Sequence, residues 1–156
     1  GVIYTARDAA HKRMLENLHK GIALPVDLKD QTIYFAGPAP AKPNEPIGSV
    51  GPTTSYRMDA YSPETIELGL TCMIGKGARS KEVVDAMKKY SAVYIGAVGG
   101  AGALISQCVK KCEVVDYADL GSEAIHRLEV VDFPGIVIID SEGNSLYETE
   151  PPKYKK

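Results

Sequence analysis

Residues 51–59, Gly-Pro-Thr-Thr-Ser-Tyr-Arg-Met-Asp, combine a sharp turn with several hydroxyl groups and one cation. Glycine permits positive φ and proline locks φ, so the first two residues favour a tight turn. If the chain turns helical at Thr53, the Thr53 hydroxyl and the Arg57 guanidinium stand at i and i+4 on one face. A guanidinium binds carboxylates and phosphates through paired hydrogen bonds. The segment therefore predicts a clamp for a small anion.

Two further cations, Arg7 and Lys76, each follow a predicted strand. In α/β domains the loops after the carboxyl ends of strands usually form the binding site. Three cations and a hydroxyl cluster in such loops suit a dicarboxylate, which carries a charge at each end. Simpler interpretations remain open: Arg7 as a surface charge beside a helix start, Thr53 as a helix cap, and Lys76 as a solvated turn residue.

The other notable residues form no self-contained catalytic motif. Residues 75–77, Gly-Lys-Gly, lack the spacing of a P-loop, and residues 99–102 lack the third glycine of a dinucleotide-binding loop. The three cysteines are interpreted as buried structural thiols, because they lack the tight C-x₂-C pairing common in iron–sulfur sites. They are Cys72, Cys108 and Cys112. His11, one helical turn beyond Arg7, either supports the site or covers the helix surface. The chain thus offers groups that hold a substrate and no obvious group that drives a reaction.

Length and composition predict one domain of ordinary globular type. The chain has 156 residues, of which 44% are hydrophobic and 24% charged, enough to bury a core without disulfides or metals. A net charge of −2 gives no electrostatic footprint for nucleic acid or an anionic membrane. No apolar run is long enough to cross a bilayer, and three cysteines, an odd number, favour a reducing cytoplasm. The chain starts at Gly1 without methionine and enters an apolar segment at once, so we expect it to lack its native N-terminal segment.

The apolar periodicity predicts an α/β domain with a mixed sheet, because strands and helices alternate in the middle of the chain while the end is rich in strands. Asp8, Ser62 and Ser80 are expected to cap helices, and residues 37–46, with four prolines, are expected to form an irregular loop. Helices are predicted over residues 8–20, 62–69, 80–90 and 102–110. Strands are predicted over residues 2–5, 32–36, 70–74, 92–98, 113–117, 127–133, 136–140 and 145–148.

Five segments carry specific motifs: residues 6–13 (Ala-Arg-Asp-Ala-Ala-His-Lys-Arg), 51–59, 75–80 (Gly-Lys-Gly-Ala-Arg-Ser), 130–134 and 140–144. Together they resemble the C-terminal domain of the class I iron–sulfur fumarases, which is a separate β subunit in two-chain versions. The resemblance covers nearly the whole chain, so residues 1–156 are expected to form a single domain of this type. The Arg57-Met58-Asp59 ending is more similar to the fumarases than to the related β subunit of L-tartrate dehydratase.

The resemblance implies a swivelling β/β/α domain, distantly similar to the mobile domain of aconitase. It implies a 4Fe-4S cluster held by cysteines of an α subunit, and therefore a hetero-oligomer in which this chain ligates no metal. Arg7, Arg57 and Lys76 would grip the carboxylates of fumarate or L-malate, and Thr53 would be the base acting on the substrate carbon. A hydroxyl is a weak base unless neighbouring cations depress its pKa.

Three other readings stay open at this point. The chain could be the β subunit of L-tartrate dehydratase, with the same chemistry on a substrate bearing one more hydroxyl. It could be a non-catalytic domain that binds a small dicarboxylate by itself. It could also be the swivelling domain of an aconitase-like dehydratase with another substrate.

Overall fold

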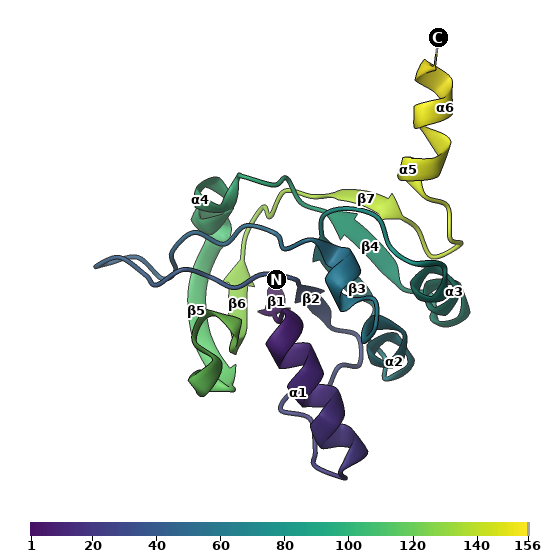
Figure 1. Ribbon diagram of the computed structural model, residues 1–156. Helices are drawn as coiled ribbons and strands as arrows, with labels where there is room; N and C mark the ends of the chain where they lie inside the picture. Colours follow the sequence, from purple (N-terminus) through teal and green to yellow (C-terminus); the bar gives the residue numbers. More distant parts are fainter. Residues whose placement is uncertain (156) are drawn as a thin grey trace.

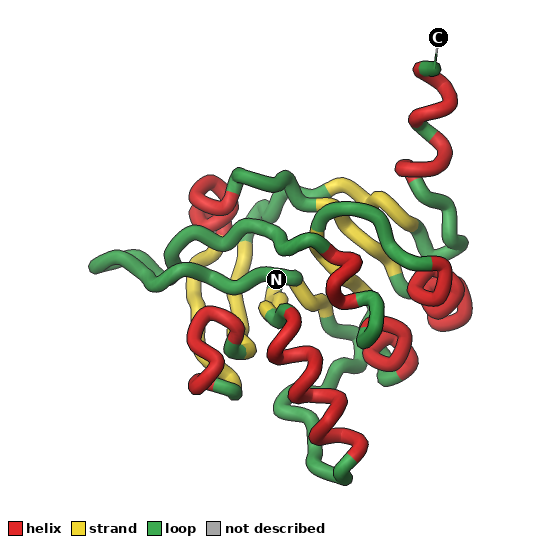
Figure 2. The backbone as a smooth tube through the Cα atoms, viewed as in Figure 1, coloured by secondary structure: helices red, strands yellow, loops and turns green. Residues whose placement is uncertain are grey.

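A single mixed sheet of seven strands organises the computed structural model, which describes residues 1–155 (Figures 1 and 2). The strand order is β5-β6-β1-β2-β3-β4-β7. The strands are β1 (Val2–Thr5), β2 (Thr32–Tyr34), β3 (Cys72–Gly75), β4 (Val93–Gly96), β5 (Val109–Asp116), β6 (Ile125–Val130) and β7 (Ile136–Ile139). Strands β1 to β4 run parallel, whereas β6 pairs antiparallel with β1 and β5, and β7 pairs antiparallel with β4. The predicted α/β class with a mixed sheet is confirmed.

Helices cover one face of this sheet, and the other face is covered largely by irregular chain (Figure 1). The longer helices are α1 (Asp8–His19), α2 (Ser62–Glu67) and α3 (Lys81–Tyr90). The short helices are α4 (Gly102–Ile105), α5 (Leu146–Thr149) and α6 (Pro151–Tyr154), with 3₁₀ turns η1 (Ser55–Met58), η2 (Ser106–Cys108) and η3 (Ala118–Glu123). None of these helices, which lie within residues 1–155, is long and apolar enough to cross a membrane.

Side-chain alternation along the strands produces two separate apolar clusters. Ile33 and Met73 join the cluster beneath α1, α2 and α3, while their neighbours Tyr34 and Ile74 join the cluster on the opposite face. Successive side chains of a strand point to opposite faces, so a doubly covered parallel sheet needs apolar residues at consecutive positions. The central strands are therefore held from both sides, which gives the loops at their carboxyl ends a rigid base.

Most local predictions are confirmed, including β1 to β4, β7, α1 to α3 and the irregular loop over residues 37–46. Ser80 caps α3 as predicted, since its Oγ accepts the Val83 N–H at 3.4 Å. The other two caps are wrong. Arg7 precedes α1 and Tyr61 precedes α2, with no capping hydrogen bond from either side chain, and Asp8 and Ser62 lie inside the first turns.

Two elements differ in type from the prediction: one gains a long-range strand partner, and the other lacks one. The helix predicted over residues 102–110 ends early, because Val109 pairs with Val130 and starts β5. The strand predicted over residues 145–148 is instead α5, in which the Ser145 carbonyl accepts the N–H groups of Glu148 and Thr149. Only Ser145 bridges back to Ile139, and α5 and α6 project away from the sheet (Figure 1). Without a partner strand, the local helical hydrogen bonds prevail.

Candidate functional site

The loops after four neighbouring parallel strands meet at one edge of the sheet. Arg7 follows β1, the chain around Thr53 packs against the end of β2, Lys76 follows β3, and Gly99 follows β4. Strands β1 to β4 are adjacent and parallel, so their carboxyl ends lie side by side. The structure therefore gathers residues that are up to 92 positions apart, from Arg7 to Gly99, into one region of the surface.

The Thr53 segment is extended and runs beside the Lys76 turn. The Thr53 N–H donates to the Phe35 carbonyl at 2.6 Å, and the Ser55 N–H donates to the Lys76 carbonyl at 2.8 Å. Thr54 and Lys76 form a parallel β-bridge. The expectation that helix starts at Thr53 is wrong, because helical geometry begins at Ser55 as the short 3₁₀ turn η1. Backbone pairing across the two loops holds Thr53 in place. The helical i, i+4 relation with Arg57 that the sequence suggested is not formed.

A buried pair of hydroxyl groups, from Tyr94 and Ser55, stabilises the contact between the Thr53 segment and the Lys76 turn. The Tyr94 hydroxyl lies 2.8 Å from both Ser55 Oγ and the Gly77 carbonyl oxygen, and burial raises the pKa of Tyr94 to about 12. A phenol has one proton to donate, and a carbonyl oxygen can only accept. Tyr94 therefore donates to the Gly77 carbonyl, and the Ser55 hydroxyl donates to Tyr94. Gly75 leaves room for this arrangement, because a Cβ at that position would lie 1.9 Å from Ser55 Oγ.

The two arginines converge on one carboxylate. Arg57 Nη2 lies 2.8 Å from Asp8 Oδ2, and Arg7 Nη2 lies 3.7 Å from the same oxygen. Arg7 Nε is also 3.4 Å from Glu123 Oε1. The sequence did not indicate Asp8 and Glu123 as parts of the site. Asp8 could have been suspected, because it is adjacent to Arg7, but Glu123 reaches the cluster from η3, 116 residues later in the chain.

Glu123 also lies at the start of α1. Its Oε1 accepts the Ala9 N–H at 3.4 Å, where the helix macrodipole favours negative charge. Gly37 permits Arg7 to lie against this corner, since a Cβ at Gly37 would be 2.9 Å from Arg7 Cδ. The Arg7 side chain is consequently only 27% exposed, whereas the Arg57 side chain is 47% exposed and accessible to a ligand.

Lys76 extends over the glycine-rich turn that follows β4. A Cβ built on Gly99 would lie 3.5 Å from Lys76 Nζ, so the ammonium group reaches that backbone. None of the ion pairs formed by residues 1–155 involves Lys76. An ammonium group without a carboxylate partner is free to bind an added anion.

His11 supports Arg7 from the core. The ring is fully buried, stacks on Tyr61 with centroids 6.0 Å apart, and meets the edge of Phe35 at 5.4 Å. Its Nδ1 lies 3.0 Å from the Arg7 carbonyl oxygen, so Nδ1 carries the proton of the neutral ring. Burial lowers the pKa of His11 to about 4. The sequence left open whether His11 supports the site or covers the helix surface. Its burial against Arg7 favours the first interpretation.

The three cysteines lie in β3, η2 and β5, outside the loops that carry Arg7, Thr53 and Lys76. Cys72, Cys108 and Cys112 are all partly buried, so the expectation of buried thiols holds only in part. Burial raises the pKa of Cys72 and of Cys112, which disfavours the thiolate form that binds iron. Within residues 1–155, no three side chains of His, Cys, Asp or Glu are grouped to hold a metal ion.

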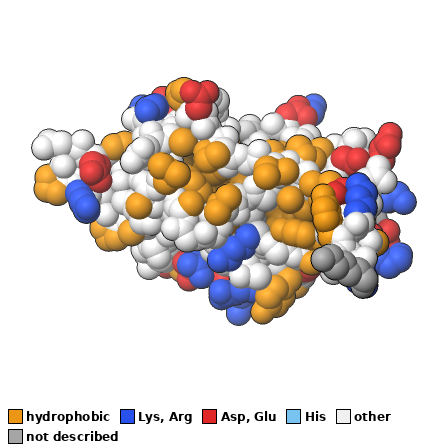
Figure 3. All heavy atoms as spheres, turned by 90° about the horizontal axis from the view of Figure 1, so that it is seen from above, with side chains coloured by type: hydrophobic (Ala, Val, Ile, Leu, Met, Phe, Trp, Pro, Cys, Tyr) orange, Lys and Arg blue, Asp and Glu red, His pale blue; other side chains and the backbone are white. Residues whose placement is uncertain are grey.

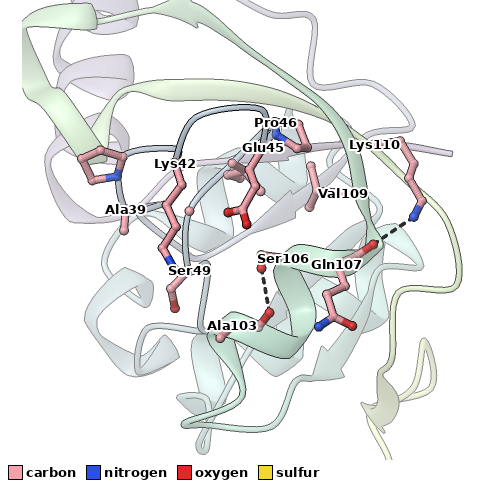
Figure 4. Close-up of a pocket in the computed structure, with 13 residues that line it drawn as sticks. Ala39, Lys42, Glu45, Pro46, Ser49, Ala103, Ser106, Gln107, Val109 and Lys110 are labelled. Carbon is pink, nitrogen blue, oxygen red and sulfur yellow. Dashed lines mark hydrogen bonds between the residues drawn. The ribbon is translucent and has the colours of Figure 1, made fainter.

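A groove of about 650 Å³ lies between the proline-rich loop and the segment around α4 and η2 (Figure 4). Lys42 and Glu45 extend into it from the loop, and Gln107 comes from the opposite wall. Its lining includes none of the four predicted site residues, Arg7, Thr53, Arg57 and Lys76.

The fold and the site together define an α/β domain that presents cations and a threonine at the carboxyl edge of a parallel sheet. The chain belongs to the family described as Fumarase C-terminus, which matches residues 1–150. The resemblance found in the motifs is thereby confirmed.

Its relatives are of two lengths. The chain is 41% identical over 150 residues to the aerobic class I fumarate hydratase of Salmonella typhimurium, covering 95% of this chain and 26% of that protein. It is 43% identical over 154 residues to the mitochondrial fumarate hydratase 1 of Leishmania major, covering 95% and 27%. It is 44% identical over 154 residues to a protein assigned as an L(+)-tartrate dehydratase β subunit in Methanocaldococcus jannaschii, covering 95% and 79%. The chain therefore spans about a quarter of the fumarate hydratases that it matches, and most of the subunit.

Proposed function

We propose that this chain is the β-subunit part of a class I fumarate hydratase, a hydro-lyase that reversibly hydrates fumarate to L-malate with a partner α subunit. The observation that carries the proposal is the bridge between Thr54, next to Thr53, and Lys76, together with the convergence of Arg7 and Arg57 on Asp8, in a chain that belongs to the fumarase C-terminal family. On this proposal residues 1–156 are one domain of a larger enzyme and lack the segment that precedes them there.

Arg7, Arg57 and Lys76 bind the substrate carboxylates. The cluster contains these three cations together with the carboxylates of Asp8 and Glu123, so one net positive charge remains for a ligand. Fumarate and malate carry two negative charges. The second carboxylate therefore needs positive groups from the partner, which is consistent with half a binding site on this chain.

Thr53 is the proposed base. Removal of a proton from the carbon next to a carboxylate builds negative charge on that carboxylate, and cations fixed at that place lower the barrier. The parallel bridge between Thr54 and Lys76 places the backbone of the lysine beside the residue that follows Thr53. A threonine base requires that a cation favour the alkoxide form of its hydroxyl, and we assign that role to Lys76 and Arg57.

Residues 1–155 do not fit an iron–sulfur cluster, because no three of their His, Cys, Asp or Glu side chains are grouped to hold a metal ion. We propose that a 4Fe-4S cluster is held by cysteines of the α subunit. Such a cluster would supply Lewis-acid chemistry for the loss of hydroxide. The contribution of this chain is to bind the carboxylates and to move the carbon-bound proton.

The surface is consistent with a partner seated on this edge. Hydrophobic side chains are spread over the face seen from above (Figure 3), and the elements at the top of Figure 1 include α4 and β7. The most exposed large ones near these elements are Val98 at 68%, Ile136 at 63% and Leu104 at 62%. A hetero-oligomer would cover them. The three free cysteines suit a reducing compartment, and we place the enzyme in the cytoplasm.

The test is to purify the chain with and without its α subunit under anaerobic conditions and to measure the hydration of fumarate. Activity is expected only when both chains are present. In that complex Thr53→Ala is expected to abolish turnover while the complex still binds a dicarboxylate. Turnover close to wild type in the Thr53→Ala complex would remove Thr53 from the mechanism.

The second candidate is the β subunit of L-tartrate dehydratase. The observation that favours it is the Methanocaldococcus relative, a β subunit of which this chain covers 79%. The same complex should be assayed with L-tartrate beside L-malate, and the larger kcat/KM decides between them. Tight dicarboxylate binding by this chain alone, without activity in the complex, would support a binding domain instead.

A further inference from the structure

Asp59 and Arg79 form a buried ion pair between the two loops that carry the site. The Arg79 side chain is 0% exposed and that of Asp59 is 15% exposed. Arg79 Nε donates to Asp59 Oδ1 at 2.7 Å, and Arg79 Nη2 donates to Ser62 Oγ at 2.6 Å. The guanidinium also lies over the rings of Phe35 and Tyr94, with its Cζ at 5.1 and 5.0 Å from their centroids. Each charged group is therefore enclosed and directed by several partners.

The pair connects two short stretches of chain with different roles. Asp59 directly follows η1, which carries Arg57, and Arg79 comes three residues after Lys76. The second oxygen of Asp59 accepts the Ser80 N–H at 2.7 Å, so the same carboxylate also fixes the start of α3. We propose that Arg79, held by Asp59, is a positioning residue that sets the placement of the Thr53–Arg57 segment relative to Lys76. This inference rests on the proposed function.

Stability alone does not account for this pair. Taking two charges out of water costs about as much as their attraction returns, so a buried ion pair contributes little net stability. The pair instead fixes the relative orientation of the two segments, because the attraction between its partners is mostly lost if the geometry changes. Arg79 donates hydrogen bonds to three partners from three different nitrogens. The partners are Asp59, Ser62 and the Met73 sulfur, which lies 3.3 Å from Nη1. A lysine at this position would keep the charge and could reproduce only one of those directions.

The sequence contained a signal for this pair. A cation just before the N-cap of a helix is disfavoured by the macrodipole unless a carboxylate compensates it. Arg79 stands immediately before the Ser80 cap of α3, and Asp59 is the carboxylate that lies there. The alternative, in which Arg79 contacts substrate, conflicts with its full burial.

The test compares Arg79→Lys with wild type in the complex with the α subunit. Displacement of reacting groups by about 1 Å can cost about 100-fold, so kcat/KM for fumarate is expected to fall by about that factor, with KM raised and kcat per folded molecule lowered. Amide hydrogen exchange over residues 53–58 and 75–80 is expected to accelerate on the order of ten-fold. Lys81→Gln is the matched control: Lys81 is 85% exposed, pairs only with Asp85 four residues along α3, and should change neither readout.

A second variant, Asp59→Asn, keeps the side-chain size and an acceptor for Ser80 but removes the charge. It is expected to shift KM, kcat and exchange in the same direction. The inference is overturned if both variants retain wild-type exchange over the two loops. It is also overturned if activity falls only in proportion to the unfolded fraction, with KM unchanged. Hydrogen exchange reports on the loops even if the enzyme acts on a substrate other than fumarate, so failure of the proposed function is distinguishable from failure of this inference.

Discussion

His11→Phe should make the chain more resistant to acid than wild type. The buried His11 ring has a pKa of about 4, against an ordinary value of 6.5, because burial disfavours the charged form and nearby Arg79 adds to this effect. The hydrogen bond to the Arg7 carbonyl and the charge of Asp8 act in the opposite direction but are outweighed. Between pH 6.5 and 4 the unfolded chain therefore binds a proton that the folded chain excludes. The free energy of unfolding therefore falls as the pH is lowered through this window. The contribution of neutral His11 to that free energy is complete only above the window.

The size of this loss follows from the difference between the two pKa values. A change from 6.5 to about 4 corresponds to about 3 kcal/mol of unfolding free energy, which is a large part of the 5–15 kcal/mol typical of a domain. Phenylalanine keeps an aromatic ring between Phe35 and Tyr61 and binds no proton. The Arg7 carbonyl keeps its other donor, the residue 11 N–H at 3.0 Å. Any cost of the substitution itself is independent of pH.

The assay is urea denaturation of the 156-residue chain at several pH values from 7.5 to about 4, comparing the slope of unfolding free energy against pH. Other groups, including His126, whose pKa is also lowered by burial, titrate in both proteins and cancel in the difference. The control is Ile22→Phe, because Ile22 is 51% exposed and neither side chain ionises, so this variant should follow the wild-type curve. Equal slopes for wild type and His11→Phe would refute the burial argument.

Three further substitutions test other parts of the structure. Arg57→Lys should raise KM and lower kcat of the assembled enzyme, because the planar fork facing the carboxylate is lost, and unchanged steady-state constants would contradict its assignment. Gly75→Ala should destabilise the chain by about 1–3 kcal/mol in urea denaturation, since the new Cβ would lie 1.9 Å from Ser55 Oγ and 3.0 Å from Phe35, and a neutral result would mean that Ser55 moves freely. Met73→Ala, at a fully buried position of β3, should cost about 2–5 kcal/mol in the same assay, and a much smaller loss would indicate that the core closes around the cavity.

Elements whose signals are local were predictable from the sequence. Ser80 caps α3 because the hydroxyl and the helix that it caps are adjacent in the chain, and residues 37–46 are irregular because four prolines exclude a regular ladder. The assignment of residues 145–148 failed for the opposite reason. The apolar residues Leu146 and Tyr147 fit a strand, but a strand requires a neighbour, and within residues 145–148 only Ser145 finds one.

By itself the sequence determined where the parallel strands end and that the proposed binding residues lie in the loops after them, because glycine, proline and charged residues mark the ends of strands within a few positions. Only the tertiary structure decided how those loops meet. The bridge between Thr54 and Lys76, the approach of Glu123 to Arg7, and the burial of Arg79 against Asp59 all join segments distant in the chain. Their energies come from desolvation and directional hydrogen bonds, which exist only after the parallel sheet has placed four loops at one edge.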